Sequence, residues 1–154
     1  MATDPQLLTD VKLELRDARL RPVYVVGEER HVIRVVQGAR PVVDLELTSG
    51  RDNLEQAILM RLLTPRGELA ELGHAEYGSR LTEVVGTPNT DTRRSLAKLF
   101  ILESLAQEPR IAKVVKVDIT PGVQRDRVDV LIVVQPIASA DTVTIGPFSL
   151  SFAA

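Results

Sequence analysis

The sequence predicts an α+β domain in which an antiparallel C-terminal sheet packs against two or three helices, preceded by a β-rich arm. Three observations support this prediction. Short β-branched runs fill the first forty residues, an apolar period near 3.6 follows residue 50, and alternation returns after residue 110. The chain has 154 residues, 44% hydrophobic and 26% charged, so it can bury a core of its own. We expect an N-terminal arm at 1–43 and a main domain at 44–154.

The first segment of the arm is expected to be a strand. Residues 10–16 alternate apolar and charged side chains, which favours a half-buried strand. A helix remains the alternative, because Leu8, Val11 and Leu15 would share one helical face. We favour the strand for its strict alternation.

The rest of the arm also has a β pattern. The β-branched runs 23–26 and 32–36 are joined by residues 27–30, and together they predict a hairpin. Residues 43–47 alternate once more and predict a further short strand. The arm is thus expected to form a small sheet ahead of the main domain.

A first helix is predicted directly after residue 50. Asp52 can cap it, and the helix must end at Thr64, because Pro65 forces the residue before it out of the α region. The inner face of this helix is formed by Leu54, Ala57, Ile58 and Leu62.

Two further helical segments follow an irregular stretch. A short turn is expected at 79–85, ended by Gly86, and the longest helix at about 91–107. The long helix is apolar over so much of its circumference that we expect the core on one side and a partner on another.

The last third of the chain predicts an antiparallel sheet. Residues 128–134 become apolar on both faces, which places them in the central strand. Pro121 and Gly122 have the residue types of a type II turn. The inward-facing parity changes around Gly146 and Pro147, which predicts a bulge in an edge strand.

Composition excludes several kinds of chemistry. The sequence has no cysteine, its two histidines do not have metal-ligand spacing, and no glycine-rich phosphate loop occurs. We therefore expect neither a metal nor a cofactor. A net charge of -2 gives no basic field for nucleic acid. No apolar run reaches the roughly 18 residues of a membrane span, and the start lacks a signal peptide, so we expect no membrane insertion and a cytoplasmic site of synthesis.

Three acidic residues near the middle are the candidates for catalysis. Glu68, Glu71 and Glu76 could in principle supply the paired carboxylates of a glycosidase. The chain has only five aromatic residues with which to hold a sugar. Solvated surface acids are the favoured interpretation, and the protein is expected not to be an enzyme.

The triplet Glu108-Pro109-Arg110 ends the predicted long helix. A glutamate in the last turn faces the negative end of the helix dipole, which is unfavourable without a compensating cation. One interpretation is a helix stop with a solvated ion pair. The other is a rigid polar latch offered to another chain, because arginine suits desolvated bidentate pairs.

Several motifs, taken in order, resemble the small baseplate-wedge proteins of contractile tails. These are the gene-25-like or W-like sheath initiators of contractile phages, shared with type VI secretion and extracellular contractile injection systems. The matching segments are 44–45 (DL), 50–57 (GRDNLEQA), 61–69 (RLLTPRGEL), 73–81 (GHAEYGSRL) and 108–110 (EPR). The family motif then falls on Asn53, Gln56, Arg61, Thr64, Gly67, Glu68, Tyr77 and Gly78.

The resemblance implies a non-enzymatic structural protein, present in six copies in the baseplate of a contractile tail or injection machine. It would join the wedge core to the first sheath ring and initiate sheath assembly, as part of a phage tail-like particle. Its partners would be other wedge proteins and sheath subunits, with the central spike or hub as a further candidate. The resemblance makes Glu108, Pro109 and Arg110 the latch to the wedge.

The resemblance also points to the last strand, because sheath subunits are joined by exchanged strands. The expected sheath-contact edge consists of Val143, Thr144, Ile145, Phe148 and Leu150. Short phage members lack the β-rich arm, so its presence favours the injection-system or larger-phage branch. Two alternatives stay open: a tail-associated, lysozyme-like peptidoglycan hydrolase, and an unrelated adaptor domain.

Overall fold

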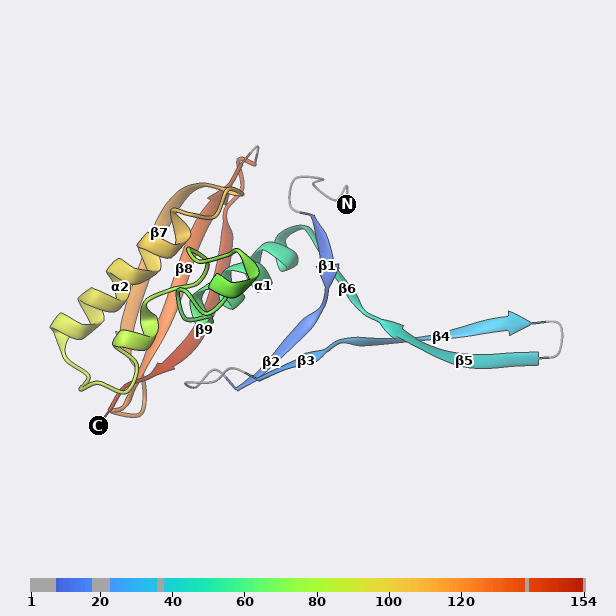
Figure 1. Ribbon diagram of the computed structural model, residues 1–154, viewed down its shortest axis with the longest axis horizontal. Coiled ribbons are helices and arrows are strands. Elements are labelled where there is room, and N and C mark those ends of the chain that lie inside the picture. The colour runs from blue at the N-terminus through green and yellow to red at the C-terminus, as the bar shows by residue number, and fades with distance from the viewer. Residues whose placement is uncertain (1–7, 18–22, 36–37, 138, 154) are drawn as a thin grey trace.

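The computed structural model describes residues 8–17, 23–35, 38–137 and 139–153. These residues form a body of helices and sheet, from which an arm of β-ribbons extends (Figure 1). The elements of the arm are β1 (Thr9–Val11), β2 (Leu13–Asp17), β3 (Val23–Val26), β4 (Glu28–Val35), β5 (Gly38–Leu45) and β6 (Leu47–Ser49). Those of the body are α1 (Gly50–Leu63), η2 (Ala70–Leu72), η3 (Leu81–Glu83), α2 (Asp91–Leu105), β7 (Ile111–Pro121), β8 (Arg127–Pro136) and β9 (Val143–Ser151).

The body contains a three-stranded antiparallel sheet in the order β7-β8-β9. The central position of β8 confirms the prediction made from its two apolar faces. Every second side chain of β8 is buried, from Val128 through Val134, whereas the alternate ones are partly exposed. One face of the sheet therefore belongs to the core and the other does not.

Both α-helices pack on the buried face of the sheet. Each fully buried aliphatic side chain contributes about 1.5–3 kcal/mol to stability, so this shared layer holds the body together. The helical side chains in the core are Leu54, Ile58, Leu62, Leu63, Ala97, Phe100, Ile101 and Leu105. The predicted α+β class is confirmed. On the opposite side of α2, Leu99 is 58% exposed and Leu102 37%.

The ends of the helices follow the sequence closely, with one difference. α1 begins at Gly50, and no side chain caps it, so the expected cap at Asp52 is wrong. Asp52 instead lies in the first turn, where its charge suits the helix dipole. α1 ends before Thr64 as predicted, and α2 is capped by Thr90, whose side chain accepts a hydrogen bond from the backbone of Arg93.

The predicted bulge in β9 is confirmed. The register between β8 and β9 shifts between Val130 and Ile132, opposite Gly146 and Pro147. Gly146 has a φ of +94°, and a Cβ there would lie 2.7 Å from the carbonyl oxygen of Val130. The backbone can approach β8 this closely only because the residue is glycine.

The predicted type II turn at Pro121 and Gly122 is wrong. β7 continues through Pro121, which pairs with Val128, and Gly122 has no positive φ. The amide of Gly122 donates to the carbonyl of Arg127 at 2.9 Å, so the chain reverses after the expected position. Ladder pairing with β8 overrides the local preference of the Pro-Gly pair.

The arm is a junction of three two-stranded antiparallel ribbons. The pairs are β1 with β6, β2 with β3, and β4 with β5. The predicted hairpin between 23–26 and 32–36 is therefore wrong, because β3 and β4 follow one another in one extended run and pair with different strands. The strand expected at 10–16 is present as β1 and β2. In Figure 1 the β4–β5 ribbon projects away from the body.

Three backbone hydrogen bonds close the centre of this junction. The amide of Lys12 donates to Glu46 at 2.7 Å, that of Gly27 to Lys12 at 2.8 Å, and that of Glu46 to Gly27 at 2.8 Å. Gly27 is buried, and a Cβ there would lie 3.0 Å from Oε2 of Glu46. A side chain at this position would therefore crowd the point at which the three strands meet.

Candidate functional site

The Glu108-Pro109-Arg110 triplet forms a compact ionic cluster just after α2. Glu108 is only 5% exposed. Its Oε1 accepts from Nε of Arg110 at 2.6 Å, and its Oε2 accepts from Nη2 of Arg61 at 3.3 Å. Arg61 comes from the last turn of α1, so the cluster joins the ends of the two helices. Sequence reasoning paired Glu108 with Arg110 but missed Arg61 as the second partner.

Two guanidinium groups keep the single carboxylate of this cluster ionised. Burial opposes ionisation of Glu108, but the hydrogen bond and charge of Arg110 and the charge of Arg61 together outweigh it and hold the pKa of the carboxyl below its ordinary value. The glutamate is therefore ionised at neutral pH. A carboxylate held by two guanidinium groups is a poor proton acceptor, so the cluster is better suited to fixing shape than to acid–base chemistry.

Tyr77 completes the cluster on its outer side. The guanidinium of Arg61 lies 4.5 Å from the centre of the Tyr77 ring, the geometry of a cation–π contact. Burial is the main cause that raises the pKa of Tyr77. Arg61 and Tyr77 also line a shallow hollow with His74 and Gln107. Pro109 is exposed beside this buried cluster, so the surface of the triplet is presented in a fixed shape.

The structure gathers part of the predicted family motif around this cluster. Thr64 follows α1 and accepts a hydrogen bond from the backbone of Ser79 at 2.8 Å. The carbonyl of Gly78 accepts one from the side chain of Ser104 on α2 at 3.3 Å. These bonds fasten the segment after α1 to both helices, and so they position Tyr77.

Other motif residues lie elsewhere. Gly67 and Glu68 are exposed in the turn after Pro65. Asn53 is buried in α1. Gln56 faces the arm rather than the ionic cluster. The predicted motif is therefore not one site: it spans the length of α1 and the segment that follows it.

The three acidic candidates lie at the surface. Glu68 and Glu71 are exposed, and Glu76 is ion-paired with Arg66. Nη1 of Arg66 also donates to Glu103 at 2.6 Å. Among the described residues no group of three or more potential metal ligands occurs. No helix within the described ranges is long and apolar enough to span a membrane.

The predicted sheath-contact edge lies on β9, at one margin of the sheet. Its side chains at Val143, Ile145 and Leu150 are buried in the core, Phe148 is partly buried, and Thr144 is exposed. A partner at this edge would thus meet mainly the backbone. Near the end of β9 one backbone group of this edge already has a partner within the chain: the carbonyl of Ser151 accepts a hydrogen bond from the amide of Gly86 at 3.1 Å.

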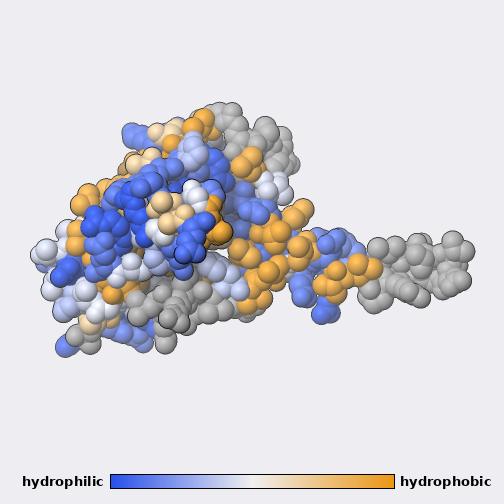
Figure 2. All heavy atoms as spheres, in the orientation of Figure 1, coloured by the Kyte–Doolittle hydropathy of each residue, from blue (hydrophilic) through white to orange (hydrophobic). Residues whose placement is uncertain are grey.

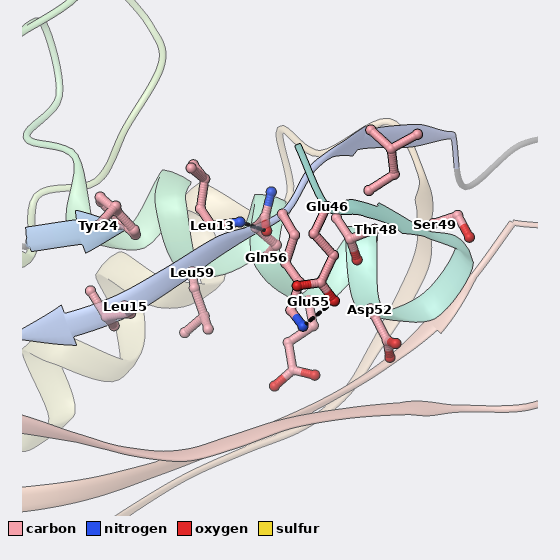
Figure 3. Close-up of a pocket in the computed structure, with 12 residues that line it drawn as sticks. Leu13, Leu15, Tyr24, Glu46, Thr48, Ser49, Asp52, Glu55, Gln56 and Leu59 are labelled. Carbon is pink, nitrogen blue, oxygen red and sulfur yellow. Dashed lines mark hydrogen bonds and ion pairs between the residues drawn. The ribbon is translucent and has the colours of Figure 1, made fainter. Parts of the chain in front are cut away.

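The contact between Gln56 and the arm is a feature that sequence reasoning did not find. Nε2 of Gln56 donates to the carbonyl of Val11 at 2.9 Å, and Oε1 accepts from the amide of Leu13 at 2.7 Å. Beside it lies a hollow of about 400 Å³ between the arm and α1 (Figure 3). Lys12 and Glu46 form an ion pair of 2.7 Å at its wall.

Tyr24 lies at the far end of the same hollow. Its hydroxyl is buried without a hydrogen-bond partner in the described part of the chain. Burial raises the pKa of Tyr24 to about 12, so this side chain stays neutral. The ring fills space between β3 and the core and so helps to seat the arm on the body.

The comparisons with known proteins identify a shared fold. No family model matches the chain, and no curated protein matches it. A solved structure, that of a proposed tail lysozyme from Geobacter sulfurreducens, matches with a TM-score of 0.60 at 18% identity. The match covers 72% of this chain and 98% of that one. The protein therefore has the fold of that tail-associated protein, together with additional chain that the latter lacks.

Proposed function

We propose that this protein is a non-enzymatic structural component of the baseplate of a contractile tail or injection machine. Six copies join the wedge core to the first sheath ring and initiate sheath assembly. The ordered motifs of the sequence support this proposal, and the fold shared with a protein described as a proposed tail lysozyme supports its association with a tail. The other wedge proteins and the sheath subunits are its partners.

The observation on which the proposal rests is the ionic cluster of Glu108. Its carboxylate is ion-paired within the chain, with Arg61 and Arg110. What remains for a partner is the exposed ring of Pro109 and the outer side of Arg110, held rigidly at the end of α2. A preorganised surface of this kind loses little entropy on binding, which suits a permanent joint in a large assembly.

The proposal is tested in cells that produce the particle. Pro109→Gly and Arg110→Ala are each expected to reduce the number of assembled particles strongly in electron micrographs, because they loosen or remove this surface. Arg93→Ala, an exposed arginine in the first turn of α2, is the matched control and should leave particle numbers unchanged. Melting curves of the purified variants establish that they are folded. Normal particle numbers in both test variants would overturn the proposed role of the triplet.

The competing function is hydrolysis of peptidoglycan. It predicts turnover of cell-wall substrate by the pure protein and loss of that turnover in Glu68→Gln. We expect no turnover, since Glu68 and Glu71 are exposed and Glu76 is paired with Arg66. Reproducible cleavage abolished by Glu68→Gln would replace the structural role with an enzymatic one.

A further inference from the structure

The three-ribbon junction has three corners, one on each strand, where the chain passes from one ribbon to the next. At each corner the central residue is Lys12, Gly27 or Glu46, and these three bond to one another. In antiparallel pairing the neighbours of a ladder-bonded residue direct their N–H and C=O groups away from the partner strand. Each corner therefore has one outward carbonyl, on the residue before the central one, and one outward amide, on the residue after it. The carbonyl and amide belong to Val11 and Leu13 at the first corner, to Leu45 and Leu47 at the corner between β5 and β6, and to Val26 and Glu28 at the corner between β3 and β4.

The first corner is filled from within the chain. The carboxamide of Gln56 bonds both outward groups, the carbonyl of Val11 and the amide of Leu13. Leu59, one turn farther along α1, lines the same hollow as Leu15 (Figure 3). A helix thus docks on a corner with one glutamine and one apolar side chain.

The corner between β5 and β6 is open. In the described part of the chain nothing bonds the carbonyl of Leu45 or the amide of Leu47. The side chains of Val43 and Leu45 share one face of β5 and are 55% and 52% exposed. Leu47 follows in β6, where it is 63% exposed and borders the hollow beside α1. Figure 2 shows apolar side chains gathered where the ribbon leaves the body. Exposed apolar side chains next to unpaired backbone N–H and C=O groups are typical of a protein interaction site.

The third corner, between β3 and β4, is better protected. It is followed by the charged residues Glu28, Glu29 and Arg30, all of them exposed. Three charged side chains in succession along one strand discourage association there. The corner at Leu45–Leu47 has only Asp44 and the paired Glu28 beside it, so it is the corner better suited to binding.

We propose that the corner at Leu45–Leu47 binds a helix of another protein, carrying a glutamine or asparagine and an apolar residue one turn later. The carboxamide would take the place that Gln56 takes at the first corner. Asp44 and Glu28 flank the open corner and favour a basic residue beside the carboxamide. This inference is independent of the proposed function, because it concerns the arm alone.

A helix fits this corner better than an added strand or a second copy. The outward edge of β5 lacks a donor at Pro41, since proline has no N–H, so a long run of strand pairing is interrupted. The bend at Glu46 leaves a single carbonyl and amide at the corner, which one carboxamide can satisfy. The α1 helix of a second copy has its own Gln56 engaged already.

The probe for this site is a stapled peptide of residues 50–63 that carries Leu54→Lys, Ile58→Lys and Leu62→Lys, so that its core-facing side becomes soluble. Added to the complete, isotope-labelled protein, it is expected to shift the amide resonances of Leu45 and Leu47 saturably, with a Kd below about 1 mM. A control peptide with Gln56→Met has equal charge and size but no carboxamide, and it should bind about fivefold more weakly or worse.

Two protein variants give a second measurement. Leu47→Pro removes the outward amide but no ladder bond, and it should abolish binding. Val43→Pro removes an outward amide two strand positions before Leu45 on the same edge and should leave binding largely intact. Dispersed spectra of both variants establish folding. The proposal is overturned if the resonances of Leu45 and Leu47 do not shift, if both peptides bind equally, or if the shifts are confined to Val11 and Leu13.

Discussion

Arg61 and Glu108 are 47 residues apart in the sequence, yet Nη2 of the arginine lies 3.3 Å from Oε2 of the glutamate. The contact joins the last turn of α1 to the chain just after α2. The positive charge of Arg61 interacts favourably with the negative end of the α1 dipole, whereas the negative charge of Glu108 interacts unfavourably with the same end of the α2 dipole. A side chain from α1 therefore compensates an unfavourable charge at the end of α2.

The first prediction is that Glu108→Ala destabilises the fold. It leaves the guanidinium groups of Arg61 and Arg110, which are only 11% and 18% exposed, without their shared carboxylate. Removing one partner of a buried ion pair costs about 3–5 kcal/mol. Urea unfolding measures the loss. Glu83→Ala breaks an exposed pair with Arg80 and should cost under about 1 kcal/mol. Equal losses in the two variants would contradict the structural role of Glu108.

The second prediction concerns pH. Folding lowers the pKa of Glu108 below its ordinary value of 4.5, so folding favours the ionised form. The resulting stability is complete above that ordinary value and is lost as the pH falls through the folded pKa. The free energy of unfolding of the natural protein should exceed that of Glu108→Gln most at pH 7, and the gap should narrow below pH 4.5. Two curves that remain parallel down to pH 3 would show that ionisation of Glu108 contributes nothing.

Much of the body could be predicted, because its signals are local. Pro65 ends α1 wherever the helix packs, the two apolar faces of β8 require a central position, and the parity change at Gly146 requires a bulge. Each of these follows from neighbouring residues alone. The buried partner of Glu108 could not be found in this way, since Arg61 is an ordinary last-turn arginine in the sequence.

The arm shows the opposite case. The β-branched runs on both sides of Gly27 predicted a hairpin, because a glycine between two strands commonly marks a turn. Its actual role depends on two distant residues, Lys12 and Glu46, whose side chains would crowd a Cβ at 3.0–3.2 Å. Three strands that change partners at one point leave no periodic signal. Local pattern established the strands, but not which strands pair.

The third prediction tests the junction. Gly27→Ala is expected to strain the three central hydrogen bonds and cost about 1–3 kcal/mol, as overpacking does in a tight site. Amide hydrogen exchange should quicken in β1 to β6, while the core of α2 and β8 keeps its protection. Glu28→Ala, at the exposed next position, is the control and should change neither region. Unchanged exchange in the arm of Gly27→Ala would show that the junction tolerates a side chain.

The last prediction concerns the edge of β9. Thr144 is exposed, and it lies opposite Val133 at a position where β9 directs its N–H away from β8. An added strand would bind such backbone groups, which makes the contact sensitive to lost donors and tolerant of side-chain changes. Thr144→Pro removes the donor and leaves the ladder to β8 intact.

In cells that produce the particle, Thr144→Pro should give baseplates that lack sheath, whereas Thr144→Val keeps the N–H and should give complete particles. Electron micrographs distinguish the two outcomes directly. The contrast between proline and valine matters because both remove the hydroxyl, so a difference between them isolates the backbone donor. If Thr144→Pro particles carry full-length sheath, β9 is not the strand on which the sheath begins, and the N-terminal β arm becomes the expected sheath contact.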